Sequence, residues 1–351
     1  MPPTARPSPT HVEPLVAREE WDAFVRTAPD ATFFHRAGWK DVLEQTFGFR
    51  SHFLTARRDG SLVGVLPLCE LRPPFGQLRL LSLPFAVEAG ISAADDDARG
   101  ALEDAAVTLA QDIGAGYLEL RDALDGDAFQ VDRDIYCRFR RSLSPRDDEN
   151  FARIPRKQRR MIRLGQSSQL CARADTDVDV FYDLFARSQR RLGTPLLPRR
   201  YFAGLLRHFA EDSVVLTVWR DDIPVAGVFS FLFRHTILPY YAGSRAEFFR
   251  YGVNDFMYWE LMRLACRRGI TTFDFGRSRR GSGAFDYKRH WGFQPEPMGY
   301  RIHPLGHRAP RKRTVDDAGV RLLRWGWRRL PLPLTKKMGP FFACHFAPYF
   351  T

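Results

Sequence analysis

The sequence predicts an α/β (α+β) protein in which two similar domains follow one another, and three observations support this fold class. The chain has 351 residues, a comfortable length for two domains of ordinary size. Hydrophobic residues make up 44% of it and aromatic residues 13%, a composition typical of folded chains. Strand-like apolar runs alternate with helical patterns, and they do so in the same order in both halves.

In the first half, the pattern predicts two helices, a hairpin, and then a strand, a helix and a strand. Trp39, Val42, Leu43 and Phe47 have helical spacing, and an Arg-Asp-Gly turn separates the hairpin strands. The predicted elements are helical segments within 21–34 and 35–47, strands at 53–57, 62–69, 77–83 and 117–121, and a helix at 95–113.

The second half repeats this order after a basic stretch and two helices at 178–192 and 201–209. Strands at 213–219, 223–233 and 236–242 precede a helix from Asn254 to Arg268, which Gly269 ends before a strand at 271–276. Residues 54–59 align with 216–221, and 63–65 align with 226–228. The shared order and these short matches favour a duplicated domain over coincidence.

Composition also suggests the domain boundaries. Residues 1–14 are rich in Pro and lack the apolar centre of a signal peptide, so we expect a disordered leader. A polar linker at 143–149 separates the halves. We therefore expect the first domain at 15–145, the second at 146–303 and a basic aromatic tail at 304–351.

Several classes of protein do not fit this sequence. No run of about 20 apolar residues occurs, which argues against an ordinary transmembrane helix. The five cysteines are far apart and form no C-x-x-C pair, and the nine histidines show no metal-ligand spacing. We expect reduced thiols in a cytoplasmic, monomeric protein without a metal site.

Positive charge is concentrated in two regions. The formal net charge is +12, and residues 301–351 hold eleven Lys and Arg against two Asp. Residues 151–173 hold seven Lys and Arg and no acid, while the rest of the chain is close to neutral. Such basic regions are suited to contact phosphates or an anionic membrane.

Five short motifs together resemble the FemAB-like aminoacyltransferases, which consist of two GNAT-type domains in tandem. The resemblance spans about residues 21–302 and is strongest to the branch associated with exosortase and PEP-CTERM export systems, also described through a BioF2-like acetyltransferase domain. The motifs are FFHRAGW at 33–39, VGVLPL at 63–68, the Lys157-x-Arg159-x-x-Ile162-Arg163 pattern, RLGTP at 191–195 and FDYKRHWG at 285–292.

The resemblance implies two GNAT-like mixed sheets with flanking helices and direct transfer of an aminoacyl or acyl group to an acceptor amine. Aminoacyl-tRNA is the donor in the best-known members, and acyl-CoA is the alternative; no tightly bound cofactor is expected. The acceptor would be an amine-bearing precursor of cell-envelope or exopolysaccharide biosynthesis. Trp39 is included among the substrate-binding candidates because it lies in the first motif.

Lys288 is the main catalytic candidate, because the family is thought to place an ammonium from this position near the reacting carbonyl. A fixed cation beside a developing oxyanion can contribute about 3 kcal/mol. Tyr287 would hold the ammonium by a cation–π contact. The alternative is a surface Lys in a basic loop. Asp274 or Asp286 would take the proton from the amine, or would simply cap a turn.

The loop Arg245–Asn254 is the expected donor-binding segment, with Arg245, Arg250, Tyr251, Gly252 and Asn254 as candidates. A coenzyme A diphosphate needs successive backbone N–H groups and several glycines, and only Gly252 is present. This departure disfavours acyl-CoA. The aromatic residues of the loop would stack on a base or belong to the core.

Further basic residues are candidates for phosphate groups of the donor or acceptor. Arg159 and Arg163 lie in the second basic region, and Arg191 precedes a Gly-Thr-Pro stop. A solvated charged turn explains the first two equally well.

The tail begins with Thr314, Asp316 and Asp317, residues that favour a helix start. Its Trp, Leu and Arg pattern is suited to the membrane interface at the inner face of the membrane. Docking on the protein body or contact with a tRNA acceptor stem are the alternatives. Two rival functions remain: an acyl-CoA-dependent N-acyltransferase acting on an amino sugar, and a non-catalytic scaffold at a membrane surface.

Overall fold

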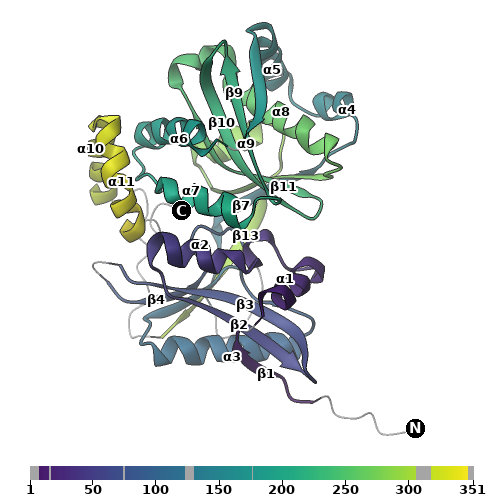
Figure 1. The fold of residues 1–351 in the computed structure, drawn as a ribbon, viewed down its shortest axis with the longest axis vertical. Helices are drawn as coiled ribbons and strands as arrows, with labels where there is room; N and C mark the ends of the chain where they lie inside the picture. Colours follow the sequence, from purple (N-terminus) through teal and green to yellow (C-terminus); the bar gives the residue numbers. More distant parts are fainter. Residues whose placement is uncertain are drawn as a thin grey trace. The chain divides into compact units, whose positions relative to one another are not determined.

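The computed structural model describes residues 8–15, 17–73, 76–122, 130–175, 177–305 and 318–346. The chain divides into two compact units, one made of residues 1–132 with 299–312 and the other of 133–298 with 313–351. Each unit contains a mixed sheet with flanking helices, which confirms the predicted fold class (Figure 1). The unit limits differ from the predicted boundaries: residues 133–145 belong to the second unit and residues 299–303 to the first, and the predicted tail at 304–351 is divided between the two units after residue 312.

The sheet of the first unit contains six main strands, and α3 (Asp96–Asp112) lies against it on the face opposite α1 and α2 (Figure 1). Within the described strands of this unit, neighbours pair antiparallel except β4 and β6, which are parallel. A two-residue strand, β5 (Ser92–Ala93), adds to β3. The strand order is β1 (His11–Pro14), β2 (Ser51–Arg58), β3 (Ser61–Leu71), β4 (Arg79–Ser82), β6 (Tyr117–Leu120) and β13 (Glu296–Pro304), and the remaining helices are α1 (Arg18–Thr27), η1 (Phe33–His35) and α2 (Gly38–Phe47).

Two sequence expectations change in this unit. Residues 11–14, expected in a disordered leader, form β1, which pairs with residues 54–57 of β2 and so satisfies the backbone groups of that edge. Residues 1–7 lie outside the described part.

Trp39, a candidate for substrate binding, is fully buried, and its Nε1 donates to the Phe33 carbonyl (3.2 Å). We correct its assignment: Trp39 is a core residue.

The second unit has a six-stranded sheet in which only β11 and β12 are parallel. The strand order is β7 (Gln130–Ser142), β12 (Thr272–Arg279), β11 (Thr236–Ser244), β10 (Ile223–Phe233), β9 (Ser213–Arg220) and β8 (Leu170–Asp175). The helices are α4 (Asp147–Ala152), α5 (Arg156–Ser167), α6 (Val178–Leu192), α7 (Arg199–His208), η2 (Ala246–Tyr251), α8 (Val253–Arg267), α9 (Gly283–His290), α10 (Ala318–Arg329) and α11 (Leu332–Phe346).

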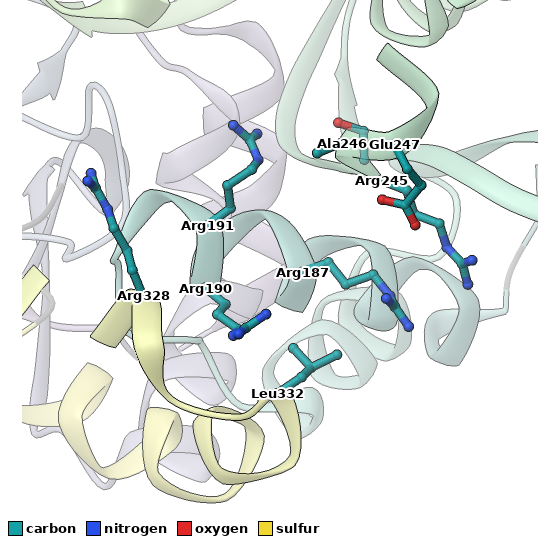
Figure 2. A pocket seen from close by; sticks show the side chains of 9 residues that line it. Arg187, Arg190, Arg191, Arg245, Ala246, Glu247, Arg328 and Leu332 are labelled. Carbon is teal, nitrogen blue, oxygen red and sulfur yellow. The ribbon is translucent and has the colours of Figure 1, made fainter. Parts of the chain in front are cut away.

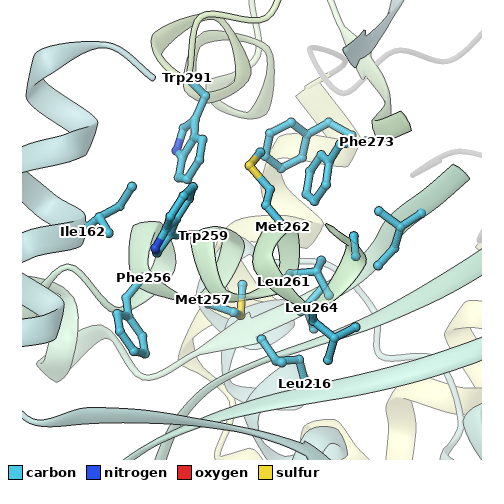
Figure 3. Close-up of a cluster of buried hydrophobic side chains, with 14 of the residues drawn as sticks. Ile162, Leu216, Phe256, Met257, Trp259, Leu261, Met262, Leu264, Phe273 and Trp291 are labelled. Atoms are coloured by element: carbon cyan, nitrogen blue, oxygen red, sulfur yellow. The ribbon is translucent and has the colours of Figure 1, made fainter. Parts of the chain in front are cut away.

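The core of the second unit lies between its sheet and α8. Phe256, Met257 and Trp259 on α8 pack near Leu216 of β9 and Ile162 of α5 (Figure 3). The α6 helix approaches β10 and β11 closely, because a Cβ added at Gly243 would lie 2.4 Å from the Leu184 main chain. Apolar packing thus fixes both α6 and α8 on the sheet.

The C-terminal helices are docked on α6. The guanidinium groups of Arg324 and Arg328 donate to the Leu192 carbonyl at the end of α6 (3.0 and 3.3 Å). Lys336 on α11 pairs with Asp183 on α6 (2.8 Å). The tail therefore packs on the protein body, as one of the alternatives predicted. The predicted helix start at residues 314–317 lies outside the described residues.

The two units share a hairpin of the same geometry, which supports the predicted duplication. Asp59 connects β2 and β3 with a φ of 51°, and Asp221 connects β9 and β10 with a φ of 54°. These residues are aligned by the internal repeat, and both adopt the left-handed conformation that Asp tolerates better than most side chains. In both units, three antiparallel strands and a helix then lead to a parallel strand.

No helix among the described residues combines the length and apolar character needed to cross a bilayer.

Candidate active site

Strands β11 and β12 pair over only a short length, although both are long. Their parallel pairing joins Thr236 with Thr272 and Ile237 with Phe273, at the first residues of each strand. Farther along, β12 shifts register against β7 between Asp274 and Arg277. Main-chain carbonyls in this part of β12 therefore need partners other than a regular ladder.

Lys288 supplies those partners from α9, the helix that Ser282 caps. Its Nζ donates to the carbonyl oxygens of Phe275 (2.6 Å), Gly276 (3.2 Å) and Arg277 (3.0 Å). An ammonium has three N–H donors, so the backbone of β12 engages all of them. Lys288 is consequently a half-buried residue that organises β12 from a helix, and the alternative of a surface Lys in a basic loop is wrong.

The charge of Lys288 is sensitive to its surroundings. Burial lowers the pKa of its ammonium to about 7; the Asp274 carboxylate opposes this shift, and the Arg277 guanidinium adds to it. A lysine in such a setting changes its charge near neutral pH. Perturbed groups of this kind are common at functional sites.

The rings closest to the ammonium belong to other residues than predicted. Lys288 Nζ lies 5.5 Å from the ring centroid of Phe139 and 6.0 Å from that of Phe275. The Tyr287 ring instead packs near Tyr258 and Trp291. Adjacent residues on a helix do not share a face, so the predicted cation–π contact between Tyr287 and Lys288 is wrong.

Asp255, in the first turn of α8, is a site candidate that the sequence did not reveal. Its Oδ1 accepts from Trp291 Nε1 (3.0 Å) and from the Tyr287 hydroxyl (3.4 Å). Burial raises the pKa of Asp255 to about 6, against the effect of these two hydrogen bonds. Tyr258, one turn later, packs edge to face on Phe275, whose carbonyl binds Lys288.

Asp255 is hard to recognise as a site residue from sequence, because the apolar run FMYWELM at 256–262, which follows it, predicts a core helix. An acidic residue at a helix start also has an ordinary explanation in the helix dipole. The one signal available is its position directly after Asn254 in the predicted donor loop.

The two predicted proton acceptors have different surroundings. Asp274 is almost completely buried and forms an ion pair with Arg138, whose Nε donates at 2.7 Å. Its Oδ1 also accepts from the Gly276 N–H (2.8 Å), at a left-handed residue of β12. Asp286 is exposed in the first turn of α9. Asp274 thus stabilises the bend that Lys288 contacts.

The predicted donor loop forms η2, whose backbone is engaged internally. Phe248 N–H donates to the Arg245 carbonyl (3.1 Å), and Gly252 N–H donates to the Phe249 carbonyl (3.0 Å). Gly252 has a φ of +70°, and an added Cβ would lie 2.4 Å from the Met161 carbonyl oxygen. This glycine therefore permits the close approach of α5. Asn254 follows in the first turn of α8.

The remaining basic candidates fall into separate groups. Arg250 lies 4.8 Å from the Tyr251 ring centroid, and Arg163 lies 5.2 Å from that of Phe151. Among the described residues, Arg159 has a buried Nε without a hydrogen-bond partner. Both Arg159 and Arg163 belong to the helix α5 and not to a turn, and Arg163 is exposed there, as the solvated alternative expects.

Arg191 and Arg245, predicted separately, line one cavity of about 420 Å³ (Figure 2). Three segments supply its walls: the end of α6, the junction of β11 with η2, and the junction of α10 with α11. The lining residues are Arg187, Arg190, Arg191, Ser244, Arg245, Ala246, Glu247, Arg328 and Leu332. Within the described residues, no group of three or more His, Cys, Asp or Glu could hold a metal ion.

Comparison with known proteins relates part of the second unit to a domain family. Residues 149–289 match the acetyltransferase (GNAT) domain family, a segment that includes Lys288, Asp255 and the η2 loop. No curated protein sequence matches the chain.

Solved structures resemble the chain over most of its length. FemX has a TM-score of 0.69 at 16% identity, with 84% of this chain and 97% of that chain covered. A tandem GNAT protein from the clavulanic acid biosynthesis pathway has a TM-score of 0.54 at 11% identity, covering 86% and 100%. The C-terminal domain of a protein assigned as a lysylphosphatidylglycerol synthetase from Agrobacterium fabrum has a TM-score of 0.56 at 12% identity, covering 81% and 91%.

At these identities the structural likeness concerns the fold, while the family match concerns the second unit. A match to an acetyltransferase domain also argues against the rival reading of a non-catalytic scaffold. The chain has the fold of FemX and of tandem GNAT proteins, residues 149–289 match the acetyltransferase (GNAT) domain family, and the protein is an acyltransferase.

Proposed function

We propose that the second unit transfers an aminoacyl or acyl group directly from an activated ester or thioester to an acceptor amine. The observation that carries this proposal is the ammonium of Lys288 on the β12 carbonyls, where β11 and β12 have ceased to pair. Unpaired strand edges offer backbone donors and acceptors to an extended ligand. Direct attack by the amine needs no covalent intermediate on the enzyme.

Charge stabilisation and proton removal are the two tasks of such a site. Attack on the acyl carbonyl creates an oxyanion, and a positioned donor or cation contributes about 3 kcal/mol to its stabilisation. Lys288 provides this positive charge through space, because the β12 carbonyls engage its three N–H donors. Asp255, whose pKa is raised to about 6, takes the proton of the amine, because a base works best when its pKa lies near the working pH.

Aminoacyl-tRNA is the donor that we favour. The η2 loop has a single glycine and uses the N–H groups of Phe248 and Gly252 within the loop. Such a loop does not supply the successive free N–H groups that suit the diphosphate of coenzyme A. The second candidate, acyl-CoA-dependent transfer to an amino sugar, is favoured by the match to the acetyltransferase domain family.

Thermal stability of the purified chain distinguishes the two donors. A ligand that binds the folded state at about 100 times its Kd stabilises it by about 2.7 kcal/mol. We expect charged tRNA to raise the melting temperature, and uncharged tRNA and acetyl-CoA to raise it less. Micromolar affinity for coenzyme A by calorimetry would reverse the ranking. Absence of transfer to any amine with either donor would contradict the proposed function.

We further infer that the acceptor is an amine-bearing precursor of the cell envelope or of an exopolysaccharide, in a system linked to exosortase and PEP-CTERM export. The support is the resemblance of the five sequence motifs. Among the described residues of α10 and α11, the exposed side chains combine apolar and basic types: Leu322 (68% exposed), Trp325 (55%) and Phe341 (63%) lie on the same helices as Arg321 and Arg329. This surface is suited to an anionic membrane, and the protein would act there as a peripheral monomer.

Vesicle sedimentation tests this location. The chain should bind phosphatidylglycerol vesicles at low salt and dissociate as salt rises, since each basic residue near the surface contributes about 1 kcal/mol. Combined Trp325→Ser and Phe341→Ser substitutions should weaken binding. Ile223→Ser, at an exposed apolar residue of the β9–β10 hairpin, is the matched control. Equal binding by the double variant and the wild type would contradict the membrane contact.

A further inference from the structure

The three carbonyl groups that bind Lys288 belong to consecutive residues, Phe275, Gly276 and Arg277. In a regular strand, successive carbonyls point in opposite directions, so one ammonium does not reach three of them in a row. Here Gly276 has a φ of +66°, and β12 shifts its register against β7 at this point. The site for the ammonium therefore depends on this bend of β12.

The Asp274 carboxylate holds the bend. Its Oδ1 accepts from the N–H of Gly276 (2.8 Å), the same residue whose carbonyl accepts from Lys288 Nζ (3.2 Å). Asp274 lies between Phe273 and Phe275 in the strand, and successive side chains of a strand point to opposite faces. The Phe275 ring lies on the side of the ammonium, 6.0 Å from Nζ. Asp274 therefore acts on Lys288 from the other face of the sheet, through the backbone and through space.

Arg138, on the neighbouring strand β7, in turn holds Asp274. Its Nε donates to Oδ2 of the buried carboxylate (2.7 Å), and its Nη2 lies 2.5 Å from the same oxygen. The residue directly opposite Asp274 in the ladder is Arg140, which pairs with Glu296 instead (2.8 Å). Because a buried carboxylate is costly without a partner, Arg138 allows Asp274 to remain ionised beside the bend.

The charges around the ammonium come from both strands. Burial disfavours the charged form of the lysine and lowers its pKa; Asp274 opposes this effect, and Arg277 adds to it. Arg138 supplies a further positive charge behind Asp274. On the side of α8, Tyr258 packs on the Phe275 ring, and burial raises the pKa of Tyr258, so it stays neutral. The Asp274 carboxylate is thus a negative charge that favours the ammonium form.

We propose that the Arg138–Asp274 pair positions Lys288: it holds the bend that receives the ammonium and supplies the negative charge that keeps the ammonium protonated. An ion pair that only joined two strands would need no bond to the Gly276 N–H. Asp274 is thereby a positioning residue and not the proton acceptor that the sequence predicted. The inference rests on the proposed function of Lys288, but the charge of the lysine can be measured without turnover.

Titration of Lys288 by NMR tests the charge effect directly. The chain has six lysines, so a sample labelled with ¹³C at lysine Cε gives few signals, and the one that Lys288→Met removes is assigned. Asp274→Asn keeps an oxygen for the Gly276 N–H but loses the charge, and should lower the pKa of Lys288 by about one unit. Arg138→Gln should raise this pKa, because it removes a positive charge. Loss of a merely structural pair would not shift the two variants in opposite directions.

Asp122→Asn in the first unit is the matched control. Asp122 also pairs with an arginine, Arg301 (2.6 Å), and it also accepts from a backbone N–H, that of Ile91 (3.1 Å). Removing this carboxylate breaks a similar arrangement far from the lysine in the sequence. The variant should therefore lower the melting temperature, as Asp274→Asn does, and leave the pKa of Lys288 unchanged.

An unchanged pKa of Lys288 in Asp274→Asn and Arg138→Gln, or shifts of both in the same direction, would overturn the inference. If Asp274→Asn does not fold, Arg138→Gln decides alone, by a raised or an unchanged pKa. In a transfer assay, the pH at which kcat falls should move with the pKa of Lys288, with KM little changed. Opposite pKa shifts without any change in transfer would support the positioning pair and contradict the proposed role of Lys288 in the reaction.

Discussion

The two units have the same order of elements but differ at two places: the pair of parallel strands, and the start of the helix that connects them. In the first unit, the four-residue strands β4 and β6 pair through three residues each. In the second, β11 and β12 are nine and eight residues long and pair through two. The following helices differ as well: the Asp95 side chain caps α3 by accepting from Ala98 N–H (2.9 Å), whereas Gly252 precedes α8 without a capping side chain.

This difference shows where a duplicated fold can acquire chemistry. The first unit pairs its buried charges: Arg301 contacts both Asp122 and Glu103. The second leaves a lysine and an aspartate half-buried with shifted pKa values, and it gathers arginines around a cavity. Satisfied groups stabilise a fold, while groups that lack a matched partner are available for a ligand.

The largest expected effect that separates the units comes from Lys288→Met. Loss of the cation should lower kcat by about 10²–10³, the scale of removing one oxyanion donor. The matched control is Lys40→Met in the first unit, where Lys40 is paired only with Glu44 one turn away. Transfer rates by both variants check this prediction. Equal rates for Lys288→Met and the wild type would show that the lysine only supports β12.

Lys288 should also leave a signature in the pH dependence of stability. The unfolded chain keeps the lysine proton to about pH 10, whereas the folded chain releases it near pH 7. The free energy of unfolding should therefore rise with pH between these values. Urea denaturation of Lys288→Met should show a smaller rise. An identical slope in both proteins would mean that the three carbonyls keep the ammonium protonated.

Asp255→Asn should have the next largest effect on turnover, about 10², typical of a general base. In the wild type, kcat should rise as Asp255 loses its proton near pH 6 and fall as Lys288 loses its proton near pH 7. The asparagine variant should lack the rising limb.

Because folding raises the pKa of Asp255, the free energy of unfolding should fall between about pH 4 and pH 6 by up to about 3 kcal/mol, and the Asp255→Asn variant should lack this fall. A normal rising limb in the variant would assign the proton to another group.

Two glycines with the same backbone angle offer a smaller, structural test. Gly252 and Gly269 both have a φ of +70°, but only at Gly252 would a Cβ meet the backbone, at the Met161 carbonyl. Gly269→Ala should cost about 1 kcal/mol for backbone strain alone, and Gly252→Ala clearly more. Urea denaturation measures both. Equal costs would show that α5 moves freely away from η2.

Asp95→Ala should have the smallest effect. Loss of this cap should lower the free energy of unfolding by about 1 kcal/mol and leave transfer activity intact, because α3 belongs to the unit without the proposed site. Melting curves and a transfer assay check both parts. A large loss of activity would place part of the reaction in the first unit.

Regular elements were predictable from sequence where apolar periodicity was strong. The helix at 178–192 and the strand at 223–233 have the predicted bounds, because their patterns are long and a turn or Gly ends them. Strand β7 was not predictable, since charged residues such as Arg138 and Arg140 alternate with its apolar ones. Helix α9 was not predictable either, because it is short and follows a Gly/Ser loop.

The candidate site was only partly predictable. Local sequence pointed to Lys288, Arg191 and Arg245, but their neighbours depend on elements far away in the chain. The three carbonyls at Lys288 arise from the shape of β12, and the cavity needs three segments to meet. Asp255 has an ordinary sequence context, and only its burial beside Trp291 sets it apart.

The return of the chain to the first unit has a consequence for synthesis in the cell. Strand β13 pairs with β6 through residues 301–304, and Arg301 belongs to the same segment. The ribosome adds about 5–20 residues per second, so residue 301 is added roughly 9–36 s after β6, its neighbour in the sheet. Until then, the β6 edge lacks β13, and the Asp122 carboxylate lacks its ion pair with Arg301. Slow codons or a stalled ribosome within the second unit should therefore expose the first unit to aggregation and to chaperones.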